Sequence, residues 1–283
     1  MCYKQVVEYR FSEDLKIIRS ILGITQSKLA KELGVQQVTV SRNEIEETKP
    51  SDSFLEKTYG YAYDKGILLN RFKSMYWEDK ILPGHKLLYH GAKSFIDGKL
   101  SVDRSRSNND FGQGFYTGES YSQAISFISG FEKSSVYLLD FDPTGLNYKE
   151  FDLTRDWMMT IAFFRGTLKG EFANSVEGYD YLIAPIADNR MYQIINSFIN
   201  GEITDQQCIH CLAATNLGKQ YVFKTEKAIS QLKIVEKLYV SDSERNYYKA
   251  VRSNESLEGE NLAKQARIQY RGKGLYIDEI LKH

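Results

Sequence analysis

The spacing of apolar residues changes near residue 86, and this change constrains the fold more than any other feature of the 283-residue chain. Before it, apolar side chains recur every three or four residues in short runs, the pattern of amphipathic helices. After it, short apolar or alternating runs typical of strands stand between helical ones. This order predicts a small helical bundle followed by an α+β domain.

Capping residues and glycines bracket each apolar run of the first part. Ser and Thr side chains accept hydrogen bonds from the free N–H groups at the start of a helix, and glycine adopts the left-handed conformation that often ends one. These signals predict four short helices in a compact bundle. They are a helix from Ser12 to Gly23, one from Thr25 to Gly34, one over residues 36–48 and one over residues 53–63.

The second part of the chain is expected to contain both kinds of element. Strands are predicted at residues 87–90, 136–141, 179–187, 220–224 and 234–240, and helices at residues 121–131, 153–165, 191–199, 205–214 and 226–232. We divide the chain into a helical module at residues 1–78, an α+β domain at residues 84–240 and a charged, helical tail at residues 241–283, with a linker over residues 75–83. The end of the tail is expected to dock through Leu275, Ile277 and Ile280.

The charge balance argues against a strongly basic nucleic-acid-binding protein, because 37 Lys and Arg residues are matched by 37 Asp and Glu residues. Any contact with nucleic acid therefore depends on a local patch. Three cysteines suit a reducing compartment rather than a disulfide framework. The N-terminus lacks the pattern of a signal peptide, and no stretch has the roughly 18 consecutive apolar residues of a membrane helix. We expect a cytoplasmic protein with no membrane partner.

The stretch TQSKLAKELGVQQVTVSRNEIEETKP carries a specific pattern. Ala30 is small where two helices would cross, and Gly34 permits a tight turn between them. The pattern resembles the repressor-type helix-turn-helix family. The matching residues are Thr25-Gln26, Leu29-Ala30, Leu33-Gly34-Val35, Val40-Ser41-Arg42, Glu44 and Pro50.

This resemblance implies DNA binding through the second helix of the motif. Its outward side chains include Gln and Arg, which reach base edges, and Thr and Ser, which suit phosphates. The acidic segment Ile45-Glu46-Glu47 stands where the family commonly has a glycine and a basic residue. A helical protein-interaction or dimerisation module is therefore the alternative, and a homodimer is one option for the assembly. The expected DNA-binding residues are Gln36, Gln37, Thr39, Ser41 and Arg42.

Two short motifs of the second part favour a flat ligand. One is Leu88-Tyr89-His90-Gly91, at the end of the first predicted strand, and the other is Asp110-Phe111-Gly112-Gln113-Gly114-Phe115-Tyr116-Thr117. The two glycines of the second motif allow an open backbone that a planar ring can approach. The two aromatic residues that follow alternate, one toward the core and one toward the cleft, where a ring is a stacking platform.

His90 can hold a ribose hydroxyl while the amide of Gly91 pairs with a carboxamide, so the two motifs together meet the needs of a nicotinamide-ribose site. They resemble the ADP-ribosyltransferases of the diphtheria-toxin and poly(ADP-ribose) polymerase type. FGQGFYTGESYSQAISF, YDYLIAPIADNRMY and GKQYVFKTEKAISQL also look like a bacterial family of uncharacterised domains, often fused to helix-turn-helix modules. The resemblance covers about residues 86–240 and implies an α+β domain of two small sheets with flanking helices.

The same resemblance implies NAD as the substrate, with no metal, and a triad of His, Tyr and Glu on three strands. His90 would hydrogen bond a ribose, Gly91 would meet the nicotinamide amide, and Tyr116 would stack on the nicotinamide ring. The implied catalytic residues are His90, Tyr116 and Gln220. The implied NAD-binding residues are His90, Gly91, Gly112, Gly114, Phe115 and Tyr116.

Gln220 departs from the family pattern, because the third triad position usually holds Glu. A glutamine can accept from and donate to a ribose hydroxyl, but it has no charge to stabilise an oxocarbenium-like transition state. A single transfer of ADP-ribose is therefore favoured over polymer elongation. Glu226 is the fallback carboxylate.

Three further features have mainly structural interpretations. Cys208 and Cys211 share one face of a predicted helix, so both thiols are expected to face the core rather than a metal. Asp188 is interpreted as a helix cap, with a place in the acceptor pocket as the alternative. Arg155 and Arg165 are interpreted as surface residues, with the pyrophosphate as the alternative partner.

The sequence predicts a mono-ADP-ribosyltransferase that transfers ADP-ribose from NAD to an unknown protein or nucleic-acid acceptor. The helix-turn-helix would target the enzyme or regulate its own operon, and a toxin or phage-defence role fits the resemblance. The alternative is a catalytically weak, DNA-binding transcription regulator that senses NAD or ADP-ribose. A regulator that binds an unrelated effector is the third hypothesis.

Overall fold

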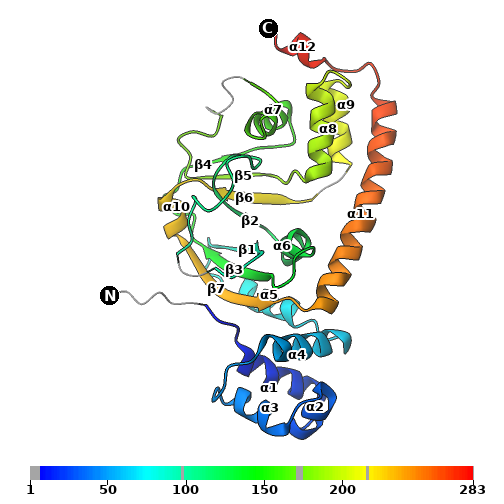
Figure 1. Cartoon of the computed structure of the whole chain (residues 1–283). Coiled ribbons are helices and arrows are strands. Elements are labelled where there is room, and N and C mark those ends of the chain that lie inside the picture. The colour runs from blue at the N-terminus through cyan, green and yellow to red at the C-terminus, as the bar shows by residue number, and fades with distance from the viewer. Residues whose placement is uncertain (1–6, 97–98, 170–174, 215–216, 283) are drawn as a thin grey trace.

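The computed structural model describes residues 7–96, 99–169, 175–214 and 217–282. A helical module lies at one end, an α+β domain at the other, and a long helix runs along the side of the domain (Figure 1). The mixed α+β class and the helical N-terminal region are as predicted. The helices of the first part are α1 (Phe11–Leu22), α2 (Gln26–Leu33), α3 (Gln37–Glu44), α4 (Asp52–Asp64) and α5 (Leu69–Lys80).

Local signals set most of the boundaries in the helical module. The Thr25 side chain accepts a hydrogen bond from the backbone N–H of Lys28, as expected of a helix cap. Gly23 and Gly34 both adopt the left-handed conformation, with φ of 63° and 64°. The prediction that Ser12 caps the first helix is wrong, because α1 already begins at Phe11 and the buried Ser12 hydroxyl donates to the backbone oxygen of Glu44 at 2.7 Å.

The strands form one seven-stranded sheet in the order β4-β5-β6-β2-β1-β3-β7, with only β4 and β5 parallel. The prediction of two small sheets is therefore wrong. The half of the sheet that contains β2 joins the half that contains β1 through the facing residues Tyr89 and Gly118. The strands are β1 (Lys86–Ala92), β2 (Phe115–Gly118), β3 (Ser135–Phe141), β4 (Tyr148–Glu150), β5 (Tyr181–Pro185), β6 (Lys219–Phe223) and β7 (Leu232–Tyr239).

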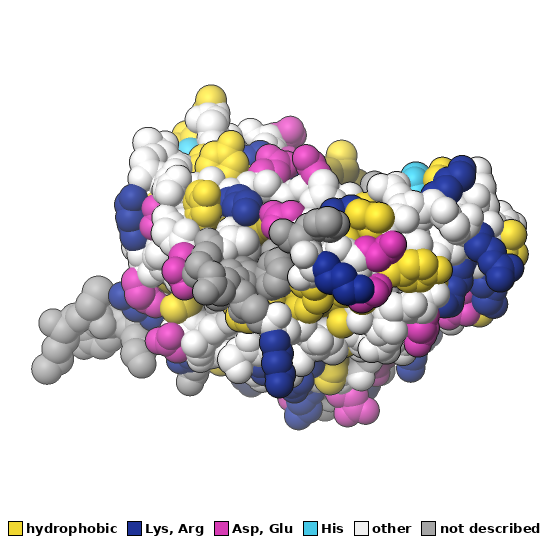
Figure 2. Space-filling view, turned by 90° about the horizontal axis from the view of Figure 1, so that it is seen from above, with side chains coloured by type: hydrophobic (Ala, Val, Ile, Leu, Met, Phe, Trp, Pro, Cys, Tyr) yellow, Lys and Arg dark blue, Asp and Glu magenta, His cyan; other side chains and the backbone are white. Residues whose placement is uncertain are grey.

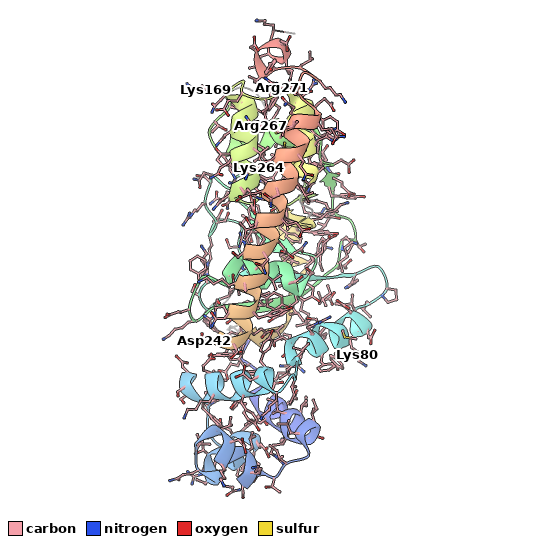
Figure 3. All side chains as sticks on the ribbon, turned by 90° about the vertical axis from the view of Figure 1, so that its right-hand side faces the viewer. Lys80, Lys169, Asp242, Lys264, Arg267 and Arg271 are labelled. Carbon is pink, nitrogen blue, oxygen red and sulfur yellow. The ribbon has the colours of Figure 1, made fainter. Side chains whose placement is uncertain are left out.

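Helices cover the sheet and one side of the domain. A core around Trp157, Leu182 and Val222 lies under α7, α8 and α9, while α6 packs on β1 and β3. The long α11 runs from Asp242, beside the module, to Arg267, near the far end of the domain (Figure 3), and so confirms the expected surface helix. These helices are α6 (Tyr121–Ile128), α7 (Arg155–Phe164), α8 (Asn189–Ile199), α9 (Asp205–Ala213), α10 (Glu226–Ser230), α11 (Asp242–Gln269) and α12 (Ile277–Ile280).

The last residues dock through two of the three expected side chains. Ile277 is buried in the core and Ile280 packs against it, whereas Leu275 is 41% exposed. Seen from above, acidic side chains lie among the basic ones (Figure 2), in keeping with the zero net charge. No helix in the described ranges combines the length and apolar character needed to cross a membrane.

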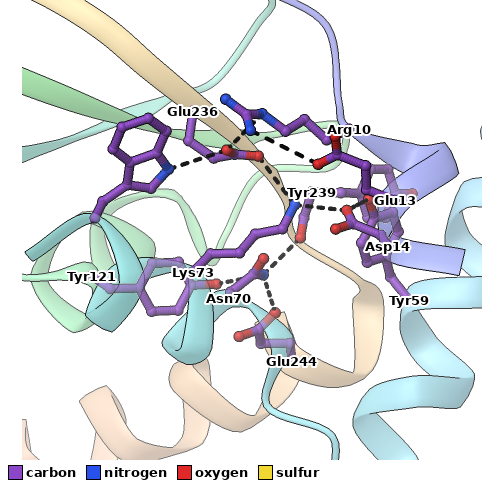
Figure 4. A network of polar contacts seen from close by, with 11 residues as sticks. Arg10, Glu13, Asp14, Tyr59, Asn70, Lys73, Tyr121, Glu236, Tyr239 and Glu244 are labelled. Atoms are coloured by element: carbon purple, nitrogen blue, oxygen red, sulfur yellow. Dashed lines mark hydrogen bonds and ion pairs between the residues drawn. The ribbon is translucent and has the colours of Figure 1, made fainter. Parts of the chain in front are cut away.

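Helix α5 crosses the boundary that we placed at residue 78 and fills much of the expected linker. It carries a buried polar network between the module and the domain (Figure 4), which we call the interface cluster. Lys73 of α5 donates to Asp14 of α1 at 2.7 Å and to Glu236 of β7 at 3.1 Å. The cluster comprises Arg10, Asp14, Tyr59, Asn70, Lys73, Trp77, Tyr121, Glu236, Tyr239 and Glu244.

Candidate functional site

A cavity of about 530 Å³ lies beside β1 and β2, and its lining includes Tyr89 and Gly118, the pair through which these two strands meet. Its volume lies in the range of about 300–1,000 Å³ that is usual for sites that bind small ligands. His90 of β1, Tyr116 of β2 and Gln220 of β6 all line it. Three side chains far apart in the sequence therefore border one space, because β1, β2 and β6 are neighbours in the sheet.

The other predicted site residues divide into two groups. Gly91, Gly114 and Phe115 also line the cavity. Gly112 and Glu226 do not line it, and Glu226 is exposed at the first position of α10. The structure therefore brings together the triad positions but not the fallback carboxylate.

His90 is held in one orientation by two neighbours. Its Nδ1 lies 2.7 Å from the backbone oxygen of Tyr116, and its ring stacks on Phe115 with centroids 4.5 Å apart. Both aromatic residues of β2 therefore border the cavity, rather than one of them facing only the core. Burial lowers the pKa of His90, and the backbone hydrogen bond opposes this less strongly.

The protonation of His90 follows from these contacts. A carbonyl oxygen only accepts, so Nδ1 must carry the hydrogen. In the neutral ring favoured by the lowered pKa, Nε2 then carries a lone pair. His90 therefore presents a hydrogen-bond acceptor at the wall of the cavity.

Tyr116 is fixed through its hydroxyl. The hydroxyl donates to the backbone oxygen of Gly112 at 2.7 Å and accepts from the backbone N–H of Phe111 at 3.2 Å. Burial, followed by the negative charge of Asp110, raises the pKa of Tyr116, so the hydroxyl keeps its proton. Gly112 has φ of 71°, and a Cβ there would lie 2.8 Å from the ring of Phe164, so this turn requires glycine.

Lys224 reinforces the same turn from the end of β6. Its Nζ donates to the backbone oxygens of Phe111 at 2.7 Å and Gln113 at 2.6 Å. Burial lowers the pKa of Lys224 to about 8. The sequence analysis did not identify this clamp, because nothing in the local pattern connects β6 to a turn more than a hundred residues earlier.

Gly91 must be glycine because a side chain there would collide with α6. A Cβ at this position would lie 2.5 Å from the backbone oxygen of Ala124 and 2.9 Å from a methyl group of Ile128. Helix α6 therefore packs directly against β1 at this point. That contact places Gln123, Ala124 and Phe127 of α6 at the wall of the cavity.

Gln220 uses both of its amide hydrogens inside the protein. Nε2 donates to Oδ2 of Asp110 at 3.0 Å and to the backbone oxygen of Pro185 at 3.2 Å. Turning the amide around would place an oxygen against two acceptors, so the assignment is unambiguous. Only Oε1 therefore remains for a ligand, and the expectation that Gln220 also donates to a ribose hydroxyl is wrong.

Asp110 and Arg165 complete this part of the site. Arg165 donates to Oδ1 of Asp110 through Nε at 2.8 Å and through Nη2, and also to the backbone oxygen of Ala187 at 3.0 Å. All three side chains of this group, which we call the cavity cluster (Asp110, Arg165 and Gln220), line the cavity. The sequence analysis assigned no role to Asp110, although its position next to the apolar Phe111, which is fully buried, was a signal that this carboxylate is not on the surface.

The remaining candidates lie elsewhere. Cys208 and Cys211 are buried in α9, as predicted, and Asp188 caps α8 by accepting from the N–H of Met191 at 2.9 Å. Arg155 pairs with Asp205 and is absent from the cavity lining. The described residues contain no group of three His, Cys, Asp or Glu side chains placed to hold a metal ion.

Helices α2 and α3 lie at the end of the module, away from the sheet (Figure 1). Gln36, Gln37 and Arg42 are exposed, and Thr39 and Ser41 are partly exposed. Two of these side chains already have partners, because Gln37 donates to Gln26 at 2.8 Å and Arg42 pairs with Glu47 at 3.3 Å. Glu44 is buried and binds Arg19 at 2.6 Å, so its role is to join α3 to α1.

Comparison with known proteins gives a family but no activity. The model of a family described as "Protein of unknown function (DUF3990)" matches residues 87–234, just over half of the chain, and the protein belongs to this family. No curated protein and no solved structure matches the chain. The matched region contains the cavity residues and leaves the helical module and α11 outside.

Proposed function

We propose that this protein is an NAD-dependent mono-ADP-ribosyltransferase. The observation that carries the proposal is that His90, Tyr116 and Gln220, from three separate strands, border one cavity. Each was expected at the site from a motif in a different part of the sequence. Residues with only a structural role would have no reason to line the same open cavity.

The lining of the cavity fits the parts of NAD. His90 presents an acceptor for a ribose hydroxyl, and Tyr116 presents a fixed ring for the nicotinamide. Lys93 also lines the cavity and supplies a cation for the phosphates. Loss of nicotinamide leaves a ribosyl cation, which an acceptor nucleophile attacks, and positioning supplies much of the rate in such a site.

The test is release of nicotinamide from NAD labelled in the nicotinamide ring. We expect the purified protein to release it, and we expect His90→Ala to lose most of the release. His85→Ala is the matched control, because His85 lies just before β1, pairs with Asp140 at 2.7 Å and does not line the cavity. Equal release by both variants would remove His90 from the site, and no release by the wild type would refute the transferase.

A sensor of NAD or ADP-ribose is the second candidate, and the uncharged Gln220 favours it. Such a protein would bind NAD without releasing nicotinamide and would change the DNA affinity of the helix-turn-helix module. Binding of NAD measured by calorimetry, together with absence of release, is the result that selects this function. Modified acceptors found by mass spectrometry of expressing cells would select the transferase and identify what it modifies.

A further inference from the structure

We infer that Asp110 supplies the negative charge that the third triad position lacks in this protein. Asp110 and Gln220 together then provide the charge and the hydrogen-bond acceptor that a single glutamate provides in the family. This inference rests on the proposed transferase function. It adds a catalytic residue to a site in which the sequence offered only the neutral Gln220 or the distant Glu226.

The position of Asp110 is the first argument. Among the described residues that line the cavity, Asp110 carries the only carboxylate. Its side chain joins Gln220 through Oδ2 at 3.0 Å, so the charge lies one hydrogen bond from the position where the family carries Glu. Glu226, by contrast, is exposed on α10 and points its charge into solvent.

The partners of Asp110 are the second argument. Arg165 engages Oδ1, which compensates the burial of the carboxylate, since Asp110 is only 6% exposed. Each carboxylate oxygen has two acceptor positions, so Oδ2 keeps one after it binds Gln220. The arginine is therefore the positioning residue, and the oxygen next to Gln220 remains open to a ligand.

The hydrogen bonding of Gln220 is the third argument. Both amide hydrogens of Gln220 are used by Asp110 and Pro185, so Oε1 is its only free polar atom. A glutamate at this position would offer a ribose hydroxyl an acceptor and a charge at the same time. Here Gln220 offers the acceptor and Asp110 offers the charge.

In the reaction, the bond between the anomeric carbon and the nicotinamide nitrogen breaks, and its electron pair leaves with nicotinamide. The ribosyl group becomes an oxocarbenium cation, and the carboxylate of Asp110 stabilises that positive charge as it grows. With water as the acceptor, a new carbon–oxygen bond forms and one proton is released to solvent. The products are nicotinamide, ADP-ribose and a proton.

The experiment is a charge exchange between the two positions. Asp110→Asn keeps the shape and removes the charge, and we expect nicotinamide release to fall about ten-fold or more while the Kd for NAD stays within a few-fold. Adding Gln220→Glu to Asp110→Asn returns one carboxylate to the pair, with the amide now at residue 110. We expect this double variant to release nicotinamide several-fold faster than Asp110→Asn, because the two positions act as one unit, although a carboxylate at residue 220 gives up the hydrogen bond to Pro185.

Asp103→Asn is the matched control, since it makes the same chemical change in the preceding loop at an exposed side chain that does not line the cavity. It is expected to release nicotinamide at the wild-type rate. The fold of every variant is checked by circular dichroism. If Asp110→Asn alone does not fold, the double variant decides, because it keeps one carboxylate within the cavity cluster.

The outcomes separate the two proposals. Wild-type release that is unchanged in Asp110→Asn overturns the role of Asp110 and leaves the transferase standing. A folded double variant that remains as slow as Asp110→Asn also overturns it, because a purely structural role gives no recovery. Absence of release from the wild type refutes the transferase, and the role of Asp110 falls with it.

Discussion

The interface cluster and the cavity cluster are built from the same kinds of side chain but have different surroundings. In the first, Lys73 joins Asp14 and Glu236 between the module and the sheet (Figure 4). In the second, Arg165 joins Asp110. No member of the interface cluster lines the cavity of about 530 Å³, whereas every member of the cavity cluster does.

This difference shows that buried charge alone does not identify a functional site. In both clusters a cation pairs with a buried carboxylate, which offsets part of the cost of burying the charge. In the interface cluster, the acceptors without a partner, Asp14 Oδ1 and Asn70 Oδ1, are buried, whereas Asp110 and Gln220 of the cavity cluster line an open space. We therefore expect changes in the interface cluster to alter stability and changes in the cavity cluster to alter chemistry.

The largest effect is expected at Lys73. Lys73→Met leaves the buried carboxylates of Asp14 and Glu236 without their shared cation, and we expect it to lower the free energy of unfolding by about 3–5 kcal/mol. The Kd for NAD of the folded protein should not change. Urea denaturation measures the first quantity and calorimetry the second.

Lys80→Met is the control for this prediction, because Lys80 is exposed on the same helix and should affect stability by no more than about 0.5 kcal/mol. A loss at Lys73 no larger than the loss at Lys80 would break the comparison, since the interface cluster would then contribute nothing to stability.

The next effect concerns the pH dependence of stability. Burial raises the pKa of Glu244, a member of the interface cluster, from 4.5 to about 7. Between these values the folded state holds a proton that the unfolded state has released, so stability falls as pH rises. At about 1.4 kcal/mol per pKa unit, this loss amounts to about 3 kcal/mol.

Glu244→Gln should remove most of this slope, because the amide resembles the protonated carboxyl and cannot ionise. The measurement is urea denaturation at pH 5 and pH 8. Glu258→Gln, at an exposed position of the same helix, should keep the wild-type slope. Equal slopes for both variants would show that Glu244 is not the titrating group.

A smaller effect is expected at Gln220. Gln220→Ala removes Oε1 and the amide that holds Asp110, and we expect nicotinamide release to fall about ten-fold, or 1.36 kcal/mol. Gln231→Ala is the control, because Gln231 is remote from the cavity lining and bonds the backbone oxygen of Thr144. Unchanged release in Gln220→Ala would place this residue outside the reaction and weaken the contrast between the two clusters.

The smallest effect is expected at the helix-turn-helix. Arg42 is exposed on α3 and pairs with Glu47 at 3.3 Å. If it contacts phosphate, Arg42→Ala should weaken binding to the DNA upstream of the gene by about 1 kcal/mol and reduce the salt slope by about one. Fluorescence anisotropy at several salt concentrations measures both, with Lys57→Ala on α4 as the control. No binding by the wild type at low salt would favour a protein-interaction module instead.

The sequence by itself determined the elements whose signals are local. Thr25 and Gly34 set the ends of α2 because a cap and a left-handed glycine act within a few residues. The alternation of apolar residues located five of the seven strands. It did not identify α5 as a helix, and it did not predict the short strand β4, because three residues such as Tyr148–Glu150 carry too little pattern.

Only the tertiary structure decided how distant residues meet. Arg165 lies 55 positions from Asp110, and Gln220 lies 110 positions from it, so no local pattern could pair them. One sheet formed instead of two because β1 and β2 share the pair Tyr89 and Gly118. Hydrogen bonding between strands depends on which edges the whole fold brings together, and that same placement opened the cavity beside His90 and gave Gln220 its charged neighbour.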